Sequence, residues 1–393
     1  MAALPIAARD AFLSDLSLAQ AAARAAKVPS RVLAEDNTWI VWRDFCLELS
    51  VDPLLENVTD PIPYFQVFGQ RYRDGRLAKD GKPVHARTVE DAMRQIGQTM
   101  ASLGAKDHRL IGPKQIDFRL SRQIAGYKTT DPPPNRVKPV PMGLIHDVHT
   151  AARISSDTFA LAVADMAVIA TYYLCRPGEY AATTQSSSRH APFRLEDVEC
   201  AIQNGIFRAS TVDLTRLPLA QFTSLIFTTQ KNGVTGEKVG HGRSLEPFAC
   251  PVLAITRRVQ HLRGHHAAPD TPLYMTFYNN AWKPVKSADI TAALRTMAAQ
   301  QFHVYGLSPA EISARSLRAG GAMALLCAKV DTDIIKLVGR WRSDEMLRYL
   351  HLQAYPLMRN LAPAMASHGS FTLLPMGLPA AALPILQAAQ ATE

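Results

Sequence analysis

Four arginines between residues 176 and 340 stand in patterns that suit the binding of a phosphate group. Arg176 lies in the segment LCRPGEY, at the end of an apolar stretch. Arg315 and Arg318 lie in SARSLRAGGA, three residues apart, so on a helix they would share one face. Arg340 follows a glycine in LVGRWRSDEMLRYLH, with Trp341 directly after it. Guanidinium groups can hold phosphate oxygens through paired hydrogen bonds, which makes phosphate the first candidate ligand.

A tyrosine and a lysine extend this set toward bond cleavage. Tyr349 follows Arg340 by nine residues, and a phenol can attack phosphorus and later leave again. A phosphotyrosine formed in this way keeps the energy of the broken phosphodiester bond. Lys231 stands in the turn sequence KNG, where its ammonium could protonate a leaving oxygen. Lys238 and Tyr355 are the alternatives for the lysine and the nucleophile.

The sequence offers little that would hold a metal ion. Its acidic residues form no cluster of the kind that binds two metals, which disfavours a two-metal nuclease. The histidines of HLRGHH match no usual ligand spacing, so we expect the polar end of a helix there; they are His261, His265 and His266. Five scattered cysteines without a CxxC pair indicate reduced core residues of an intracellular protein. We predict no metal and no cofactor.

Taken in order, these residues resemble the motifs of the tyrosine recombinase, or phage integrase, superfamily. The matches are Arg176 and Glu179 for the first box, Lys231 for the hairpin lysine, Arg318 for the second box, Arg340 or Trp341 for the third-box His/Trp position, and Tyr349 for the nucleophile. SLRAGGA and GRW, with the spaced tyrosine, are most similar to recombinases of DIRS-like retroelements. The motifs cover about residues 170–355.

The resemblance implies a site-specific recombinase or integrase that cuts and rejoins DNA strands through a 3′-phosphotyrosine, without a metal ion. The catalytic residues would be Arg176, Lys231, Arg315, Arg318, Arg340, Trp341 and Tyr349, with Glu179 in support. The implied partners are double-stranded DNA and further copies of the chain, as a tetramer on two DNA sites, with no membrane. The implied location is with DNA, in the nucleus of a eukaryotic host and otherwise in the cytoplasm or nucleoid.

One departure from the family leaves other functions open. The second box usually begins with histidine, and Arg315 stands there. Arginine cannot be a general base near neutral pH, but it can donate hydrogen bonds to phosphate. A catalytically weakened DNA-binding relative is therefore one alternative. A type IB topoisomerase-like enzyme, which relaxes DNA as a monomer, shares the chemistry. A helical interaction scaffold would show no salt-sensitive affinity for DNA.

Two predicted domains would position these residues. Residues 1–130 contain helical patterns, among them one that opens at Thr88 with capping-box spacing to Asp91 and carries Arg94 on its polar face. The proline-rich, basic segment 128–142 cannot continue a helix and is predicted to be the linker. The candidate DNA contacts of this half are Arg94, Lys128, Arg136 and Lys138.

The catalytic domain is predicted over residues 143–355. Helical patterns cover about 144–153, 158–174, 251–264 and most of 287–355, and strand-like runs lie near 193–207 and 222–229, the latter followed by a hairpin turn. The tail 356–393 is a candidate for docking on a neighbouring subunit. The expected fold class is therefore mainly α with a small antiparallel β-sheet, in which a helical N-terminal core-binding domain precedes a mixed α/β catalytic domain.

Composition agrees with this organisation. The 393 residues are 47% hydrophobic, and 43 Lys and Arg against 34 Asp and Glu leave a net charge of +9. Residues 1–142 contribute +4 and the remainder +5, which suits a polyanion that contacts both halves. The longest apolar run, Thr158 to Cys175, contains Asp165 and ends at Arg176, so we expect a buried helix there instead of a membrane span.

Overall fold

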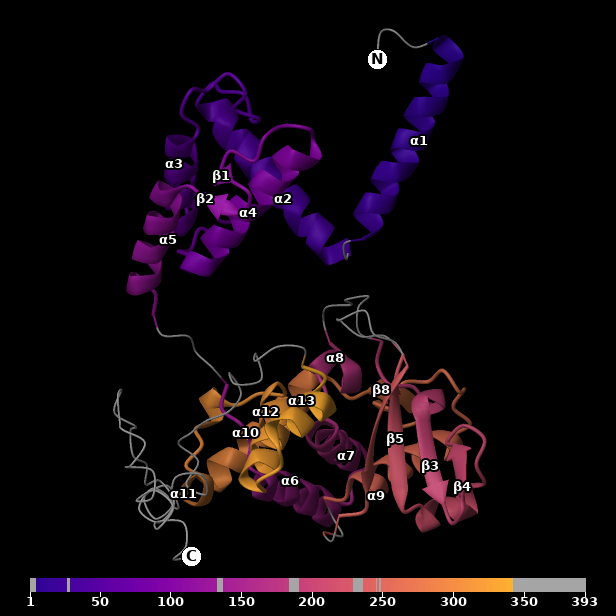
Figure 1. The fold of residues 1–393 in the computed structure, drawn as a ribbon. Coiled ribbons are helices and arrows are strands. Elements are labelled where there is room, and N and C mark those ends of the chain that lie inside the picture. The colour runs from indigo at the N-terminus through magenta and orange to yellow at the C-terminus, as the bar shows by residue number, and fades with distance from the viewer. Residues whose placement is uncertain are drawn as a thin grey trace, which may run out of the picture.

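The chain forms two groups of elements, each with its own hydrophobic core. The structure is a computed structural model that describes residues 5–26, 29–132, 137–183, 191–228, 236–244, 246 and 249–341. Figure 1 shows α1–α5 together with β1 and β2 in one group, and the elements from α6 onward in the other. One core draws on residues 42–124 and the other on residues 140–317. Lys231, Tyr349, Tyr355, Arg136 and the tail 356–393 lie outside the described residues.

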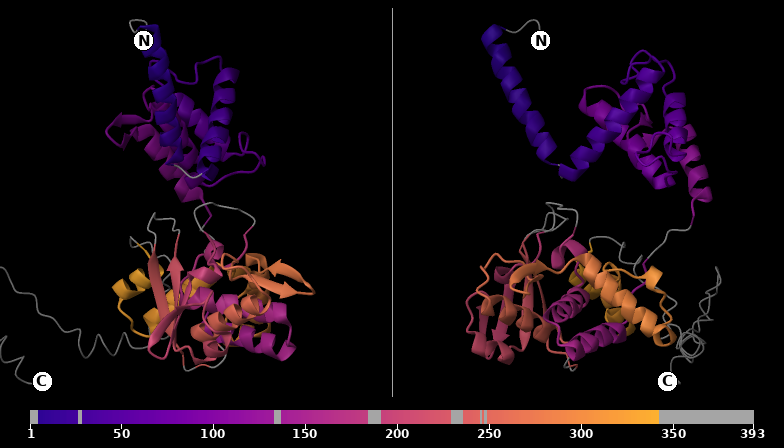
Figure 2. Two further views of the ribbon diagram at one scale, coloured as in Figure 1. Left: turned by 90° about the vertical axis from the view of Figure 1, so that its right-hand side faces the viewer. Right: turned by 180° about the vertical axis from the view of Figure 1, so that it is seen from behind.

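The N-terminal group is helical. Its elements are α1 (Ile6–Ala25), α2 (Pro29–Glu48), α3 (Ile62–Arg73), α4 (Ala86–Ser102), β1 (Leu110–Gly112), β2 (Gln115–Ile116) and α5 (Phe118–Thr130). Trp42 of α2 stacks on Phe65 of α3 with ring centroids 4.8 Å apart, and Phe68 meets the same indole edge-on. Aromatic contacts thus bring α2 and α3 together, while α1 extends away from the other helices of this group in Figure 1 and in the right-hand view of Figure 2.

Helix α4 begins two residues earlier than the sequence predicts. Its first residue is Ala86, so Thr88 lies inside the first turn and the expected Thr88 cap is wrong. A free N–H group at the start of the helix finds its acceptor outside the helix: the carboxylate of Asp131 accepts a hydrogen bond from the Ala86 amide at 2.9 Å. A long-range contact of this kind leaves no local pattern, and it pins the end of α5 to the start of α4.

The second group packs helices against a small sheet. Its elements are α6 (Met142–Ser155), α7 (Thr158–Tyr172), α8 (Pro177–Tyr180), η1 (Leu195–Asp197), β3 (Val198–Ile202), β4 (Gly205–Arg208), η2 (Leu214–Leu219), β5 (Phe222–Phe227), β6 (Glu237–Gly242), α9 (Pro251–Gly264), β7 (Met275–Tyr278), β8 (Ala281–Pro284), α10 (Ser287–Gln300), α11 (Phe302–Tyr305), η3 (Pro309–Glu311), α12 (Ser316–Cys327) and α13 (Thr332–Gly339). The four-stranded sheet has the order β4-β3-β5-β6, antiparallel throughout. The predicted fold class, mainly α with a small antiparallel sheet, is confirmed.

Helix α7 runs through the middle of this core. Asp157 caps it by accepting from the Phe159 and Ala160 amides, and the residues from Ala162 to Thr171 are buried. Asp165, its one charged residue, meets the buried His149 at 3.2 Å and the Arg257 Nε at 3.0 Å, which compensates the buried charge. Within the described residues no helix is both long enough and apolar enough to cross a membrane.

Two glycines let α12 approach its neighbours closely. A Cβ on Gly321 would lie 2.1 Å from the Thr171 carbonyl oxygen of α7, and one on Gly320 would lie 2.2 Å from the Val140 carbonyl oxygen. Both positions therefore exclude any side chain. This contact places Arg318, two residues before the first of these glycines, beside the end of α7.

Candidate active site

The turn between α7 and α8 is the base of the site. Leu174 has a left-handed backbone with φ 47°, which is rare for a bulky residue and turns the chain sharply. Arg176 then precedes the first turn of α8, where its amide donates to Glu179 Oε2 at 2.7 Å. The Arg176 Nη1 also donates to Glu179 Oε1 at 3.1 Å. The buried Glu179 therefore fixes both the backbone and the guanidinium of Arg176.

Arg340 joins the same carboxylate from the end of α13. Its backbone is left-handed, with φ 57°, and its Nη2 lies 2.9 Å from Glu179 Oε2. Nη1 donates to the Tyr173 carbonyl at 3.2 Å, and Nη2 to the Leu174 carbonyl at 3.3 Å. The guanidinium carbon also lies 3.6 Å from the ring centroid of Phe227. Burial lowers the pKa of Arg340, and the charge of Glu179 opposes that shift.

Arg318 shares an acceptor with Arg340. Its Nη1 donates to the Leu174 carbonyl at 2.7 Å, and its Nη2 donates to the carbonyl of Gly339. The indole of Trp341 lies over its guanidinium, with the ring centroid 4.2 Å away. A Cβ on Gly339 would meet that indole at 1.7 Å, so the glycine of GRW makes room for the tryptophan. We call Arg176, Arg318, Arg340 and Glu179 the arginine cluster.

The members of the predicted set differ in how open they are to solvent. Arg318 and Arg340 are buried and donate to backbone carbonyls, while the Arg176 side chain is 23% exposed. Arg315 lies just before α12, and its side chain is exposed, whereas that of Arg318 is buried. Of the predicted arginines, Arg176 and Arg315 are therefore the more accessible to solvent.

The predicted lysine and nucleophile, Lys231 and Tyr349, lie outside the described residues. Strand β5 ends at Phe227, against Arg340, four residues before Lys231. The chain after Trp341 leads to Tyr349. The alternative lysine, Lys238, lies on β6 and holds both carboxylate oxygens of Glu199 at 3.0 Å, which commits it to the sheet.

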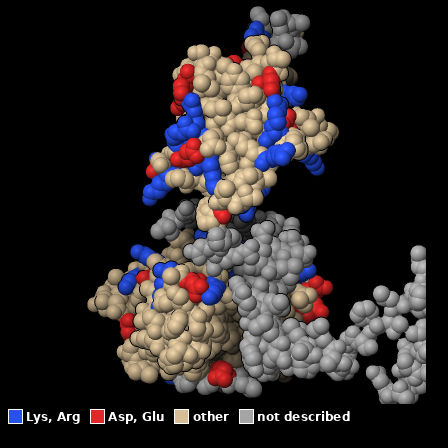
Figure 3. Space-filling view, turned by 90° about the vertical axis from the view of Figure 1, so that its left-hand side faces the viewer, with Lys and Arg blue, Asp and Glu red and all other residues tan. Residues whose placement is uncertain are grey.

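The candidate DNA contacts that the structure describes are paired with acidic residues of the chain. Arg94 meets Asp91 at 2.7 Å, Lys128 meets Glu90 at 2.8 Å, and Lys138 meets Glu311 at 2.8 Å. All three pairs are at least partly exposed. Breaking such an ion pair costs little free energy, so each basic side chain could contact a phosphate instead. On the face shown in Figure 3, Lys and Arg line both flanks of the N-terminal group, where some Asp and Glu lie among them, and uncharged residues fill the middle.

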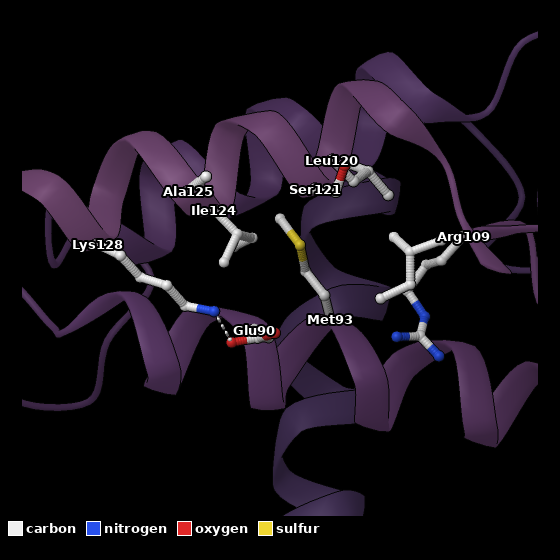
Figure 4. A pocket seen from close by; sticks show the side chains of 9 residues that line it. Glu90, Met93, Arg109, Leu120, Ser121, Ile124, Ala125 and Lys128 are labelled. Carbon is white, nitrogen blue, oxygen red and sulfur yellow. Dashed lines mark ion pairs between the residues drawn. The ribbon is translucent and has the colours of Figure 1, made fainter. Parts of the chain in front are cut away.

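A small pocket lies beside Lys128. Figure 4 shows Met93 from α4 and Ile124 from α5 facing into it, with the Lys128–Glu90 pair at one end and Arg109 at the other. Arg109 is itself paired with Asp107, at 2.6 Å. The lining is therefore mostly apolar and its charges are matched, which does not favour a charged small ligand.

The histidine-rich segment lies at the end of α9, as the sequence predicts. His261 Nε2 accepts from the Phe277 amide at 2.9 Å and lies 2.9 Å from the Thr276 hydroxyl, which ties α9 to β7. Burial, followed by the charges of Arg258 and His265, lowers the pKa of His261 to about 4. Among the described residues, no three His, Cys, Asp or Glu side chains gather as metal ligands would.

Sequence reasoning missed the acceptors that hold the arginines. The carbonyls of Tyr173, Leu174 and Gly339 belong to the backbone, so residue types do not mark them. Phe227 lies at the end of a strand that the sequence does predict, but its contact with Arg340 joins positions that are far apart in the chain.

Comparisons with known proteins give structural likeness at low sequence identity. No family model matches the sequence, and no curated protein matches it. A lambda integrase dimer bound to a core site is similar with 13% identity and a TM-score of 0.48, over 88% of this chain and 96% of that one. A Tn1549 transposon integrase in complex with transposon right end DNA has 11% identity and a TM-score of 0.43, over 78% and 85%. XerA recombinase has 14% identity and a TM-score of 0.36, over 92% and 99%.

Proposed function

We propose that this protein is a DNA strand-exchange enzyme of the tyrosine recombinase type. The observation that carries the proposal is the arginine cluster, in which Arg176, Arg318 and Arg340 converge from three distant segments on the α7–α8 turn. Concentrated positive charge of this kind stabilises the negative charge that develops on a phosphate during transfer. The likeness of SLRAGGA and GRW to recombinases of DIRS-like retroelements supports a role in a mobile element.

The proposed reaction transfers a phosphodiester twice. The Tyr349 hydroxyl loses its proton to water as its oxygen forms a bond to the scissile phosphorus, while the bond from phosphorus to the 5′ oxygen breaks. Lys231 gives the proton that the leaving 5′ oxygen takes up. The 5′ hydroxyl of a partner strand then attacks the 3′-phosphotyrosine, which releases Tyr349 and joins the strands.

Arg176 and Arg315 are assigned to the phosphate oxygens because their side chains are the open ones. Glu179 and Arg340 hold Arg176 and the α7–α8 turn in place. Trp341 covers Arg318, so that guanidinium reaches the phosphate only after the indole has moved.

At the level of the whole chain, residues 1–130 and 143–355 are the two halves of a clamp around duplex DNA, joined by the linker 128–142. Net charges of +4 and +5 in the two parts of the sequence support contact with both. We assign assembly to a tetramer on two DNA sites, in which the tail 356–393 docks on a neighbouring subunit. The protein would act wherever its target DNA lies inside the cell.

A nicked suicide duplex carrying candidate element ends tests the proposal. We expect a protein–DNA adduct on a denaturing gel with the native chain and its loss with Tyr349→Phe. Arg176→Ala should slow adduct formation by about 10²–10³-fold, the usual effect of removing one preorganised donor. Arg208→Ala, on β4, is the matched control and should react at the native rate. An adduct that persists with Tyr349→Phe would contradict the assignment of the nucleophile.

A DNA-binding relative without catalysis is the second candidate. Two observations favour it. Arg315 stands where the family has histidine, and the guanidinium groups of Arg318 and Arg340 donate hydrogen bonds to backbone carbonyls. This candidate predicts tight binding of the same duplex without an adduct. A topoisomerase-like enzyme would instead relax supercoiled plasmid as a monomer, without a specific site.

A further inference from the structure

Helix α1 is a long helix that the other described residues of the chain leave uncovered. Every side chain from Ala8 to Ala26 is exposed, and the Arg24–Asp36 ion pair at 3.0 Å joins the end of α1 to α2. An isolated helix of this length is marginal in water, and most helices in proteins are stabilised by packing of one face. Figures 1 and 2 show α1 diverging from α2. A packing partner for α1 is therefore expected.

The sequence of α1 provides a face for such a partner. Residues at helical spacing form an apolar row, which we call the α1 stripe: Ala8, Phe12, Leu16, Ala19 and Ala23. The steps of three and four residues place them on one side of the helix, while Asp10 and Ser14 lie on the other. At 1.5 Å per residue the stripe is about 22 Å long.

Helix α2 carries a second uncovered apolar row. Its inner face buries Trp42 and Phe45, while Leu33, Ile40 and Leu47 point away from that core with exposures of 62%, 46% and 75%. They recur every seven residues, so they lie almost on one line along the helix. This row, the α2 line, is about 21 Å long, which matches the α1 stripe.

We infer that the α1 stripe of one copy of this chain packs on the α2 line of a second copy. Within the described part of one chain both rows are exposed, and two copies packed in this way would cover both. The rows agree in length, and each is flanked by charges of both signs: Arg9 and Asp15 beside the stripe, Arg43 and Asp44 beside the line. Flanking charges of this kind pair across two helices packed along an apolar seam. The inference does not depend on the proposed reaction.

Disulfide trapping between two differently tagged chains tests the contact. One chain carries Leu16→Cys on the α1 stripe, and the other carries Ile40→Cys on the α2 line. After mild oxidation without DNA, we expect a mixed disulfide-linked dimer on a non-reducing gel. The control replaces Leu16→Cys by Leu18→Cys, which lies off the stripe and is 67% exposed, and the mixed dimer should be lost. The unsubstituted chain reports any linkage through the five native cysteines.

A second arm separates contact between copies from closure of α1 onto α2 of the same chain. A single chain with both Leu16→Cys and Ile40→Cys, diluted to low concentration, would form an internal disulfide if α1 closed on its own α2. An internal disulfide together with no mixed dimer would overturn the inference. A mixed dimer of equal yield with the Leu18→Cys control would overturn it as well. Because all three positions are exposed, circular dichroism should show the native fold for each variant.

Discussion

At the residue scale, Glu179 organises the guanidiniums around it. One carboxylate fixes the Arg176 amide, the Arg176 guanidinium and Arg340. The sequence predicts that Arg176, Arg318 and Arg340 belong to one site, and the structure brings them together. The sequence does not predict that these arginines differ in exposure. Arg318 and Arg340 are buried because distant segments contribute the carbonyls and aromatic rings that surround them.

Substitution of Arg340 by lysine tests whether the residue is structural. Lysine keeps the charge but has no planar fork, so it cannot serve Glu179 and the Tyr173 and Leu174 carbonyls together. We expect Arg340→Lys to lower the free energy of unfolding by about 2–3 kcal/mol, the cost of leaving buried acceptors unpaired. Urea unfolding measures it. The exposed Arg315→Lys is the control, and equal midpoints for the two variants would contradict the structural role.

The lowered pKa of His261 predicts a pH effect on stability. In the unfolded chain a histidine binds its proton near pH 6.5, while the folded protein resists protonation until about pH 4. The contribution of this residue is therefore complete above pH 6.5 and declines as the pH falls from 6.5 to 4. We expect the native chain to lose more stability than His261→Gln between pH 7 and pH 4.5 in urea titrations. Parallel losses in the two proteins would contradict the assignment.

At the element scale, local patterns predict the helices better than their ends or the hairpins. The helix predicted over 251–264 matches α9, which begins with Pro251 in its first turn. The predicted start of α4 was wrong, because the acceptor for its first amide, Asp131, comes from the far end of α5. The β7–β8 hairpin received no prediction, since its short strands carry little periodic signal. The glycines of SLRAGGA do suggest close approach, and the structure supplies the carbonyls that they approach.

Two glycine substitutions test the packing of α12 by their opposite signs. Gly321→Ala would force a methyl group to 2.1 Å from the Thr171 carbonyl oxygen, so we expect a loss of about 1–3 kcal/mol in unfolding free energy. Gly126→Ala, within α5, places its methyl group in open space and should add about 0.5–1 kcal/mol through helix propensity. Thermal unfolding of both variants checks the pair. Similar stability changes would contradict the close approach of α12 to α7.

At the scale of the whole molecule, the proposed clamp requires that both groups of elements contact DNA. Composition predicts this shared role, since the excess of positive charge is divided between the two parts of the sequence. How the two parts hold a duplex does not follow from sequence, because the linker between them has no fixed hydrophobic pattern. The salt dependence of binding reports on the phosphate contacts directly.

Removing one basic residue from each group should lower that salt dependence. We expect Arg94→Ala and Arg315→Ala each to reduce the slope of log K against log salt by about 0.9, the value for one lost phosphate contact. Fluorescence anisotropy with a labelled duplex at several salt concentrations measures the slope. Arg24→Ala, whose guanidinium pairs with Asp36 at the α1–α2 junction, should leave the slope unchanged. An unchanged slope for Arg94→Ala would remove the N-terminal group from the proposed DNA interface.

The most direct test of the central claim is the identity of the residue that DNA becomes attached to. The covalent adduct from the suicide duplex can be digested with trypsin and nuclease and sequenced by mass spectrometry. If the protein is a tyrosine recombinase, a nucleotide will be linked through its 3′ phosphate to Tyr349 in the native chain. Attachment to Tyr355, to any other residue, or through a 5′ phosphate would contradict it.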